Sequence, residues 1–310
     1  MDEKPGADAN ASAKPEAPTL LTRLMKAPIT SALMAINLAV FVWAERSGGT
    51  TDEGTLLRFG AVEPLHVWAG EYWRVATYMF LHIGWIHILV NSYASFGWAT
   101  TLEAALGKVR FLAVYLLAGV AGGCASVISG ILFGAHLSAG ASGALFGIIG
   151  ATLALRARRL ESFKAFFADR PVRSTLVQLA IWIALGFQLH FDNAAHVGGF
   201  AAGAVMAWLF TSSAPRAGWV AFAVGMIALF LGAIRPWWSP SGEHQNDIAI
   251  YARSYLTGKN PHPDTTEPWP VNVPRGIAFA KKGCSHGVAY ACEVLKGAEG
   301  HEAPSTPSEH

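Results

Sequence analysis

The most informative pattern along the chain is the way charged residues separate long apolar stretches. Six stretches contain no Asp, Glu, Lys or Arg, and they are Ile29–Ala44, Val75–Leu102, Phe111–Leu155, Ser174–Phe191, Asn193–Pro215 and Ala217–Ile234. An ionised side chain at mid-bilayer costs at least about 2.5 kcal/mol, and about 20 apolar residues span the hydrocarbon core. The pattern therefore predicts an all-α protein that crosses a membrane several times.

The third stretch, Phe111–Leu155, has 45 residues and is too long for one crossing. Turn-forming residues over 134–140 interrupt it, so we expect two crossings there and seven in the chain. The second of this pair, Ser142–Leu155, would rise only about 21 Å against a hydrocarbon core about 30 Å thick. Ser142 should therefore lie below the membrane surface, in a recess that water can enter.

Composition excludes several classes of protein. Of the 310 residues, 52% are hydrophobic and only 14% are charged, whereas a soluble domain has about 25% charged residues. The formal net charge of +2 provides no basic excess for nucleic acid, so no nucleic-acid partner is expected. The three cysteines are too few for a four-thiolate metal site, and we expect neither a metal nor a cofactor.

The distribution of Lys and Arg predicts the orientation in the membrane. One connection between crossings carries most of them, namely Arg156, Arg158, Arg159, Lys164, Arg170 and Arg173. Positively charged loops face the cytoplasm. Alternation then places the N-terminus in the cytoplasm and both the Glu45–Arg74 loop and the C-terminal tail outside. No organelle-targeting signal is recognised, so a cell (inner) membrane is favoured over a mitochondrial inner membrane.

The same pattern predicts four segments. Residues 1–28 should be a disordered cytoplasmic tail, 29–212 a six-helix core, 213–234 a seventh transmembrane helix, and 235–310 an extracytoplasmic tail. Short helices are expected in that tail at Ile248–Leu256 and Ile277–Leu295. One straight helix would hold Cys284 and Cys292 about 12 Å apart, too far for a disulfide, unless Gly287 breaks it. A disulfide and two free thiols remain equally open.

Polar residues inside the predicted crossings are the functional candidates. Lipid offers no hydrogen-bond partners, so polar groups there must find their partners within the protein. His82, His87 and Asn91 lie in the second crossing, Ser142 begins the fourth, and His196 lies one turn inside the sixth. His87 and Asn91 are four residues apart and share a helix face. All these groups can lie toward the outer leaflet, so they can converge.

Small residues on two predicted helices can bring the Ser142 hydroxyl and the His196 imidazole together. Gly199 and Gly203 follow His196 at a spacing that permits close helix approach, and Gly143 and Gly147 follow Ser142 in the same way. A crossing of these two helices would place His196 beside Ser142.

Such a pair has a clear chemistry. His196 as general base would take the Ser142 proton, and Ser142 would attack a peptide carbonyl to form an acyl-enzyme. The oxyanion donors would be the backbone N–H groups near Ser142 and the side chains of Asn91 and His87. No third carboxylate is expected near the pair.

These residues resemble the rhomboid family of intramembrane serine proteases over about residues 30–210. The motifs, in order, are Glu71-Tyr-Trp-Arg74, His82-x4-His87-x3-Asn91, Gly140-Ala-Ser-Gly143 and Asn193-x-Ala-His196-x2-Gly199-x3-Gly203. The resemblance implies a six-helix bundle plus a seventh C-terminal helix, without a metal. It also implies that Ser142 is the nucleophile, His196 the base, and Asn91 and His87 the oxyanion donors. Phe146 stands where many relatives have Tyr beneath the catalytic His.

The resemblance implies cleavage of transmembrane protein substrates near their outer ends, with those substrates and the lipid bilayer as partners. A non-catalytic rhomboid-like protein that binds membrane clients is the alternative, and retention of both Ser142 and His196 disfavours it. A transporter or channel is less favoured, because the polar groups gather toward one side of the membrane. The substrate and the oligomeric state remain open.

Overall fold

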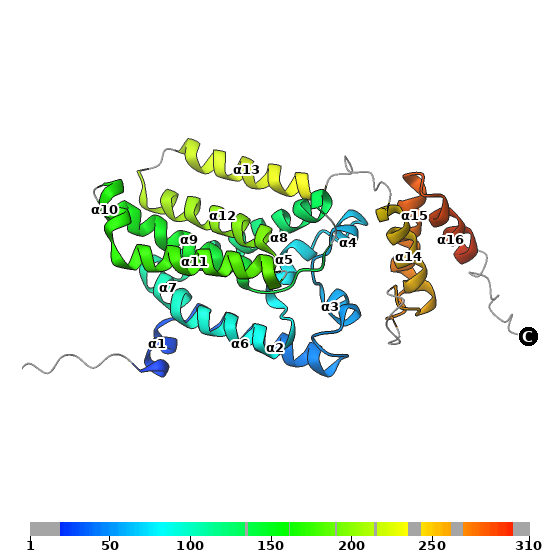
Figure 1. Cartoon of the computed structure of the whole chain (residues 1–310), viewed down its shortest axis with the longest axis horizontal. Coiled ribbons are helices and arrows are strands. Elements are labelled where there is room, and N and C mark those ends of the chain that lie inside the picture. Colours follow the sequence, from blue (N-terminus) through cyan, green and yellow to red (C-terminus); the bar gives the residue numbers. More distant parts are fainter. Residues whose placement is uncertain are drawn as a thin grey trace, which may run out of the picture.

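The computed structural model describes residues 19–133, 136–160, 162–189, 191–213, 216–234, 243–261 and 269–299. Within these ranges the protein is helical from α1 to α16, and its only extended pairing is an isolated bridge between Val62 and Ser138 (Figure 1). The predicted all-α class is therefore confirmed.

Five helices in the described ranges are long and apolar enough to cross a membrane, and a bent helix pair raises the number to six. The five are α2 (Pro28–Arg46), α8 (Lys108–Phe133), α11 (Arg170–Leu189), α12 (Asn193–Thr211) and α13 (Arg216–Ile234). The predicted fourth crossing is α9 (Ser142–Arg159), whose last turn carries three arginines. The chain is a multi-pass membrane protein.

The second crossing differs from the prediction of one helix over Val75–Leu102. The chain instead forms α5 (Arg74–Thr77) and a 3-10 turn (Tyr78–Phe80), and bends by 89° before α6 (Gly84–Ala94). A π-helical turn (Ser95–Ala99) and α7 (Thr100–Leu106) continue from α6. Gly84 begins α6 with φ +68°, a conformation that glycine adopts at little cost. Absence of charge showed that this stretch is apolar but did not reveal the bend.

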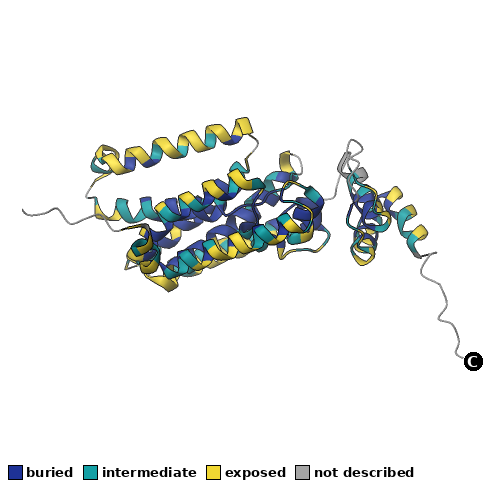
Figure 2. Cartoon of the chain, turned by 90° about the horizontal axis from the view of Figure 1, so that it is seen from below, coloured by how far each residue is buried: buried dark blue, intermediate teal, exposed yellow. Residues whose placement is uncertain are grey.

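α9 lies at the centre of the bundle and packs against α8 and α12. A Cβ atom on Gly199 would collide with the Gly143 carbonyl oxygen, and one on Gly203 would collide with the Gly147 carbonyl oxygen. The predicted glycine crossing of α9 and α12 is therefore confirmed. By contrast, α13 has Ala233 as its only buried residue, and exposed positions dominate the outer surface of the bundle (Figure 2).

The short helices gather at two opposite ends of the bundle (Figure 1). α1 (Leu20–Lys26) and α10 (Phe163–Ala168) lie at one end, and α3 (Glu53–Phe59) and α4 (Pro64–Trp68) lie at the other. This grouping agrees with the predicted alternation of loops between the two sides. Residues 20–26 form a helix, so an ordered segment begins inside the tail that was expected over 1–28.

The C-terminal segment forms a helical subdomain of α14 (Glu243–Thr257), α15 (Val273–Ser285) and α16 (Ala289–Glu299). The helix expected over Ile277–Leu295 is broken between α15 and α16, where Gly287 has φ +82°. Cys284 and Cys292 form a disulfide with their Cα atoms 4.6 Å apart. The break thus allows the first of the two alternatives, a disulfide across the turn.

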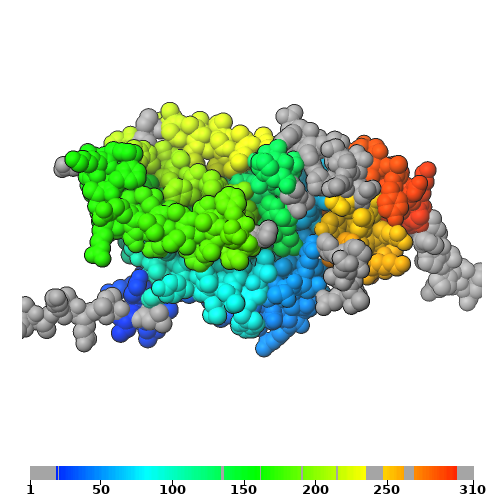
Figure 3. Space-filling model, in the orientation of Figure 1, coloured from blue at the N-terminus to red at the C-terminus, as the bar shows by residue number. Residues whose placement is uncertain are grey.

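The subdomain contacts the segment that precedes α5 (Figure 3). Tyr251 donates a 3.2 Å hydrogen bond to Glu53, and Gly54 lies against Trp269 and Pro270. Leu57, Leu65 and Trp68 share a buried cluster with residues of α14 and α15. The junction is therefore a packed interface.

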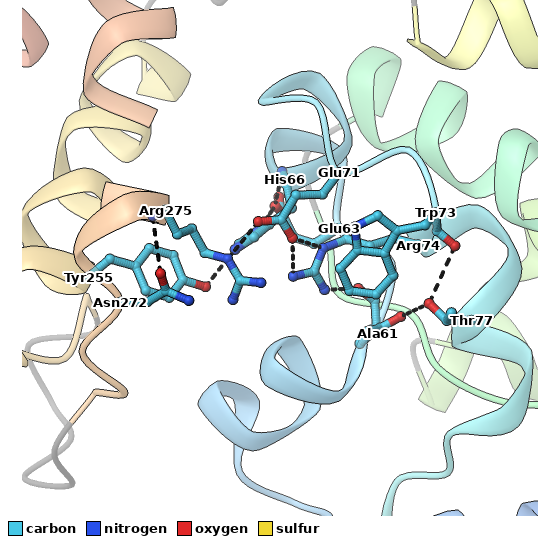
Figure 4. A network of polar contacts seen from close by, with 11 residues as sticks. Ala61, Glu63, His66, Glu71, Trp73, Arg74, Thr77, Tyr255, Asn272 and Arg275 are labelled. Atoms are coloured by element: carbon cyan, nitrogen blue, oxygen red, sulfur yellow. Dashed lines mark hydrogen bonds and ion pairs between the residues drawn. The ribbon is translucent and has the colours of Figure 1, made fainter. Parts of the chain in front are cut away.

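A polar network crosses the same junction (Figure 4). The carboxylate of Glu71 binds Arg74 at the start of α5 and Arg275 from α15. Arg74 is fully buried and donates a 2.7 Å hydrogen bond to the Ala61 carbonyl. His66 lies between Glu63 and Tyr255, with Nδ1 2.6 Å from Glu63 Oε2 and Nε2 2.7 Å from the Tyr255 hydroxyl.

Candidate active site

Ser142 is held at the start of α9 by the loop that leads into it. Ser138 forms both backbone hydrogen bonds of the bridge to Val62, at 2.8 and 3.0 Å. The Gly140 N–H donates to the Tyr78 carbonyl at 3.0 Å, and Gly140 has φ +145°. These contacts orient the Ser142 hydroxyl, which is partly exposed, at the end of the helix that carries partial positive charge.

His196 reaches this hydroxyl from α12. Its Nε2 lies 2.9 Å from Ser142 Oγ, although 54 residues separate the two in sequence. The glycine crossing described above makes this approach feasible, because no side chains separate the two helix backbones at that point. If Nε2 accepts the Ser142 proton, a neutral His196 carries its own proton on Nδ1.

Phe146 lies against the imidazole. The two rings are stacked, with centroids 4.1 Å apart and planes within 2° of parallel. Phe146 follows Ser142 by four residues on α9, so one helix face presents both the hydroxyl and the ring that supports the imidazole. The ring stacks on the imidazole without a tyrosine hydroxyl.

α6 places His87 beside the Ser142 loop. A Cβ atom added to Gly140 would lie 2.9 Å from His87 Nε2 and 3.7 Å from Ser142 Oγ, so glycine leaves the space that the imidazole occupies. The Ile83 N–H donates to His87 Nδ1 at 3.2 Å, which leaves Nε2 directed to the loop. A neutral ring that accepts at Nδ1 is a donor at Nε2.

Asn91 lies one turn further along α6 and is 5% exposed. Its Nδ2 donates a 2.9 Å hydrogen bond to the His87 carbonyl. His82 lies in the bend before α6 rather than within a helix, and its ring contacts that of His87 edge to face at 5.3 Å. The structure thus brings Ser142, His196 and His87 together, with Asn91 bonded to the backbone of His87.

Sequence reasoning missed a carboxylate near the imidazole. Asp192 caps α12, where its Oδ1 accepts a 2.9 Å hydrogen bond from the Ala195 N–H. It lies one turn before His196 and interacts electrostatically with that ring. The expectation that no third carboxylate lies near the pair is wrong. The available signal was an acidic residue four positions before His196, at the predicted start of the sixth crossing.

Within the described ranges, no group of three or more His, Cys, Asp or Glu side chains is arranged to hold a metal ion.

His66, which the sequence did not single out, belongs to the junction with the C-terminal subdomain.

Comparison with known proteins identifies relatives of one kind. The family model described as the Rhomboid domain matches residues 69–213. The chain is 35% identical over 254 residues to "Rhomboid protease GluP" of Bacillus subtilis, covering 78% of this chain and 46% of that protein. It is 31% identical over 207 residues to "Rhomboid-like protease 2" of Toxoplasma gondii, covering 63% of this chain and 70% of that protein.

A third relative is "Putative rhomboid protease YdcA" of Bacillus subtilis, which is 33% identical over 148 residues, or 47% of this chain and 71% of that protein. The chain spans about half of the length of the first of these relatives and of several further curated relatives.

Proposed function

Since the chain belongs to the rhomboid family, we propose that it is an intramembrane serine endopeptidase that acts through a Ser142–His196 dyad and an acyl-enzyme. Its substrates are transmembrane proteins, which it cleaves near the outer side of the bilayer. The observation that carries this proposal is the 2.9 Å separation of His196 Nε2 and Ser142 Oγ.

In the proposed reaction, His196 removes the proton of Ser142 as the hydroxyl attacks the peptide carbonyl. Collapse of the tetrahedral intermediate releases the amine product, which takes the proton from His196. Water, activated by the same imidazole, then hydrolyses the ester. The partial exposure of Ser142 supports access of water from the side at which α9 begins.

The developing oxyanion needs donors that are already in position. Nε2 of His87 is directed to the loop beside Ser142, and the first N–H groups of α9 have no partner within their own helix. Asn91 is the remaining predicted donor. Its amide also bonds the His87 carbonyl, so it can act on the oxyanion directly or by fixing the position of His87.

We further propose that the protein lies in a cell (inner) membrane with its N-terminus in the cytoplasm. The basic connection between α9 and α11 supports this orientation. The disulfide in the C-terminal subdomain also supports it, because disulfides persist in oxidising compartments outside the cytoplasm.

The decisive experiment combines covalent labelling with substrate cleavage. The detergent-solubilised protein is treated with a fluorescent fluorophosphonate, and single-span membrane proteins are co-reconstituted with it in liposomes and analysed by mass spectrometry. We expect wild-type labelling and cleavage within the transmembrane segment, and their loss in Ser142→Ala and His196→Ala. Ser212→Ala, which removes a hydroxyl at the opposite end of α12, should behave as wild type.

Labelling that persists in Ser142→Ala would contradict the assignment of the nucleophile. A folded wild-type protein that neither reacts with the probe nor cleaves any of the membrane proteins would favour the alternative of a non-catalytic client-binding protein.

A further inference from the structure

The carboxylate of Asp192 is more buried than its role as a helix cap requires. Its side chain is 9% exposed, and its Oδ1 already accepts the capping hydrogen bond from Ala195. Its Oδ2 is buried and makes no hydrogen bond of normal geometry with the described residues. A cap alone does not require a second buried oxygen that carries charge.

Polar groups from two other elements surround this carboxylate. Ser126 of α8 and Ser138 of the loop before α9 face it, and Nε2 of His136 lies 3.8 Å from Oδ1. Burial raises the pKa of Asp192, but its polar contacts with His136, Ser126, Ala195 and Ser138 outweigh burial and lower the pKa to about 2. Asp192 is therefore a carboxylate at neutral pH.

The imidazole of His196 also has a buried polar atom that makes no hydrogen bond with the described residues. Nε2 is committed to Ser142, whereas Nδ1 is buried and has no hydrogen-bond partner among the described residues. Asp192 precedes α12 by one residue, its carbonyl accepts the His196 N–H at 3.1 Å, and its charge acts on the His196 ring. The other titratable neighbour of this ring is His87 of α6, and Tyr78 faces Asp192.

We propose that Asp192 is a positioning residue for His196, a role that rests on the proposed function. Its charge favours the ring orientation in which Nδ1 carries the proton and Nε2 faces Ser142. When the Ser142 proton moves to Nε2, the same charge stabilises the imidazolium, which keeps both protons until the leaving amine takes one. Asp192 remains ionised throughout and exchanges no proton.

A neutral cap separates this electrostatic role from a structural one. Asp192→Asn and Asp192→Ser both retain a good N-cap acceptor for α12 while they remove the charge. Asp52→Asn is the matched control, because Asp52 caps α3 in the same way, with Oδ2 accepting from the Thr55 N–H. Each variant is compared with wild type in the detergent-solubilised 310-residue chain.

The measurement is the concentration dependence of fluorophosphonate labelling, which separates the maximal inactivation rate from the apparent binding constant. For Asp192→Asn and Asp192→Ser we expect the maximal rate to fall about tenfold and the binding constant to change less than twofold, since a buried charge acts strongly at short range. Their melting temperatures should stay within about 2 °C of wild type, and Asp52→Asn should label as wild type.

A maximal rate equal to wild type in either folded Asp192 variant would overturn the proposal. So would a loss of rate that occurs only together with a lower melting temperature in both variants, since that result indicates a purely structural cap. Failure of the dyad itself gives a different result, because wild type would then label no faster than Ser142→Ala.

Discussion

Where α9 crosses α12, glycine backbone atoms lie directly against each other. Where the C-terminal subdomain contacts the segment before α5, charged and aromatic side chains make the contact, with Glu71 shared between Arg74 and Arg275 (Figure 4). At Gly199 and Gly203 in the first region, the nearest atoms belong to the α9 backbone, which cannot move aside as a side chain can. The second consists of side chains whose charges and protons can change.

This difference follows from the surroundings of each region. Between apolar helices in lipid, burial of apolar surface provides little driving force, so close packing of small residues and the hydrogen bonds it permits must hold the helices together. At the junction, Arg74 is fully buried and its charge requires a partner. We therefore expect the crossing to be sensitive to added volume, and the junction to be sensitive to loss of charge and to pH.

The largest effect should come from volume added at the crossing. A side chain at Gly203 would collide with the backbone of Gly147, so Gly203→Val should destabilise the bundle by more than about 3 kcal/mol and abolish fluorophosphonate labelling. A melting curve in detergent measures the first effect.

Gly225→Val is the control for glycine replacement within a transmembrane helix, because no atom lies within 4 Å of a Cβ at that position. It should melt and label as wild type. If Gly203→Val also melts at the wild-type temperature, the two backbones are not as close as the structure indicates.

An intermediate effect is expected from charge removal at the junction. Glu71→Ala leaves the buried Arg74 without its carboxylate and removes the ion pair to Arg275. Loss of one partner from a buried pair costs about 3 kcal/mol, so the melting temperature of Glu71→Ala should be lower than that of wild type.

Labelling of Ser142 should fall several-fold in the same variant, because Arg74 bonds Ala61, next to the Val62–Ser138 bridge that orients the Ser142 loop. Glu293→Ala removes an exposed carboxylate of α16 and should leave both measurements unchanged. Equal behaviour of the two variants would show that Glu71 does not join the two parts.

The smallest effect should be the response of the junction to pH. Burial lowers the pKa of His66 despite its hydrogen bond to Glu63. Burial raises the pKa of Glu63, but its contacts with His66 outweigh burial and lower that pKa overall. Both groups bind protons more weakly in the folded protein than as free side chains. The contribution of His66 to stability is therefore fully present above the ordinary pKa of histidine, about 6.5.

As the pH falls through about 6.5, His66 should destabilise the junction, by about 1 kcal/mol between pH 7.5 and 5.5. Thermal unfolding followed by tryptophan fluorescence tests this, since Trp68 and Trp269 lie in the buried cluster at the junction. His66→Gln should remove the dependence in that range. An unchanged dependence in His66→Gln would assign it to other groups.

The crossings themselves were largely predictable from charge-free stretches, because exclusion of ions from hydrocarbon acts on every residue independently of its distant partners. The glycine crossing was also predictable, since Gly143, Gly147, Gly199 and Gly203 show their spacing in the sequence. The bend before Gly84 was not, because an apolar composition is compatible with both a straight helix and a bent one.

The candidate site also contains residues that the sequence identified and one residue, Asp192, that it did not. Ser142, His196, His87 and Asn91 were identified as polar residues within apolar stretches, and their recognition required no knowledge of contacts. The proximity of Asp192 to His196 was missed because an acidic residue at a helix start is also an ordinary cap. Only its burial, and the polar groups around it from α8 and the Ser142 loop, distinguish it from a cap.

The sequence by itself determined the membrane-spanning class, the approximate crossings and the polar residues that lie within them, because hydrophobicity and charge are properties of local segments. Tertiary structure alone decided that His66 meets Tyr255 and that Glu71 meets Arg275, across 189 residues in the first case. It also selected the disulfide over two free thiols. Such contacts depend on the path of the whole chain, which brings together groups whose local sequences give no sign of each other.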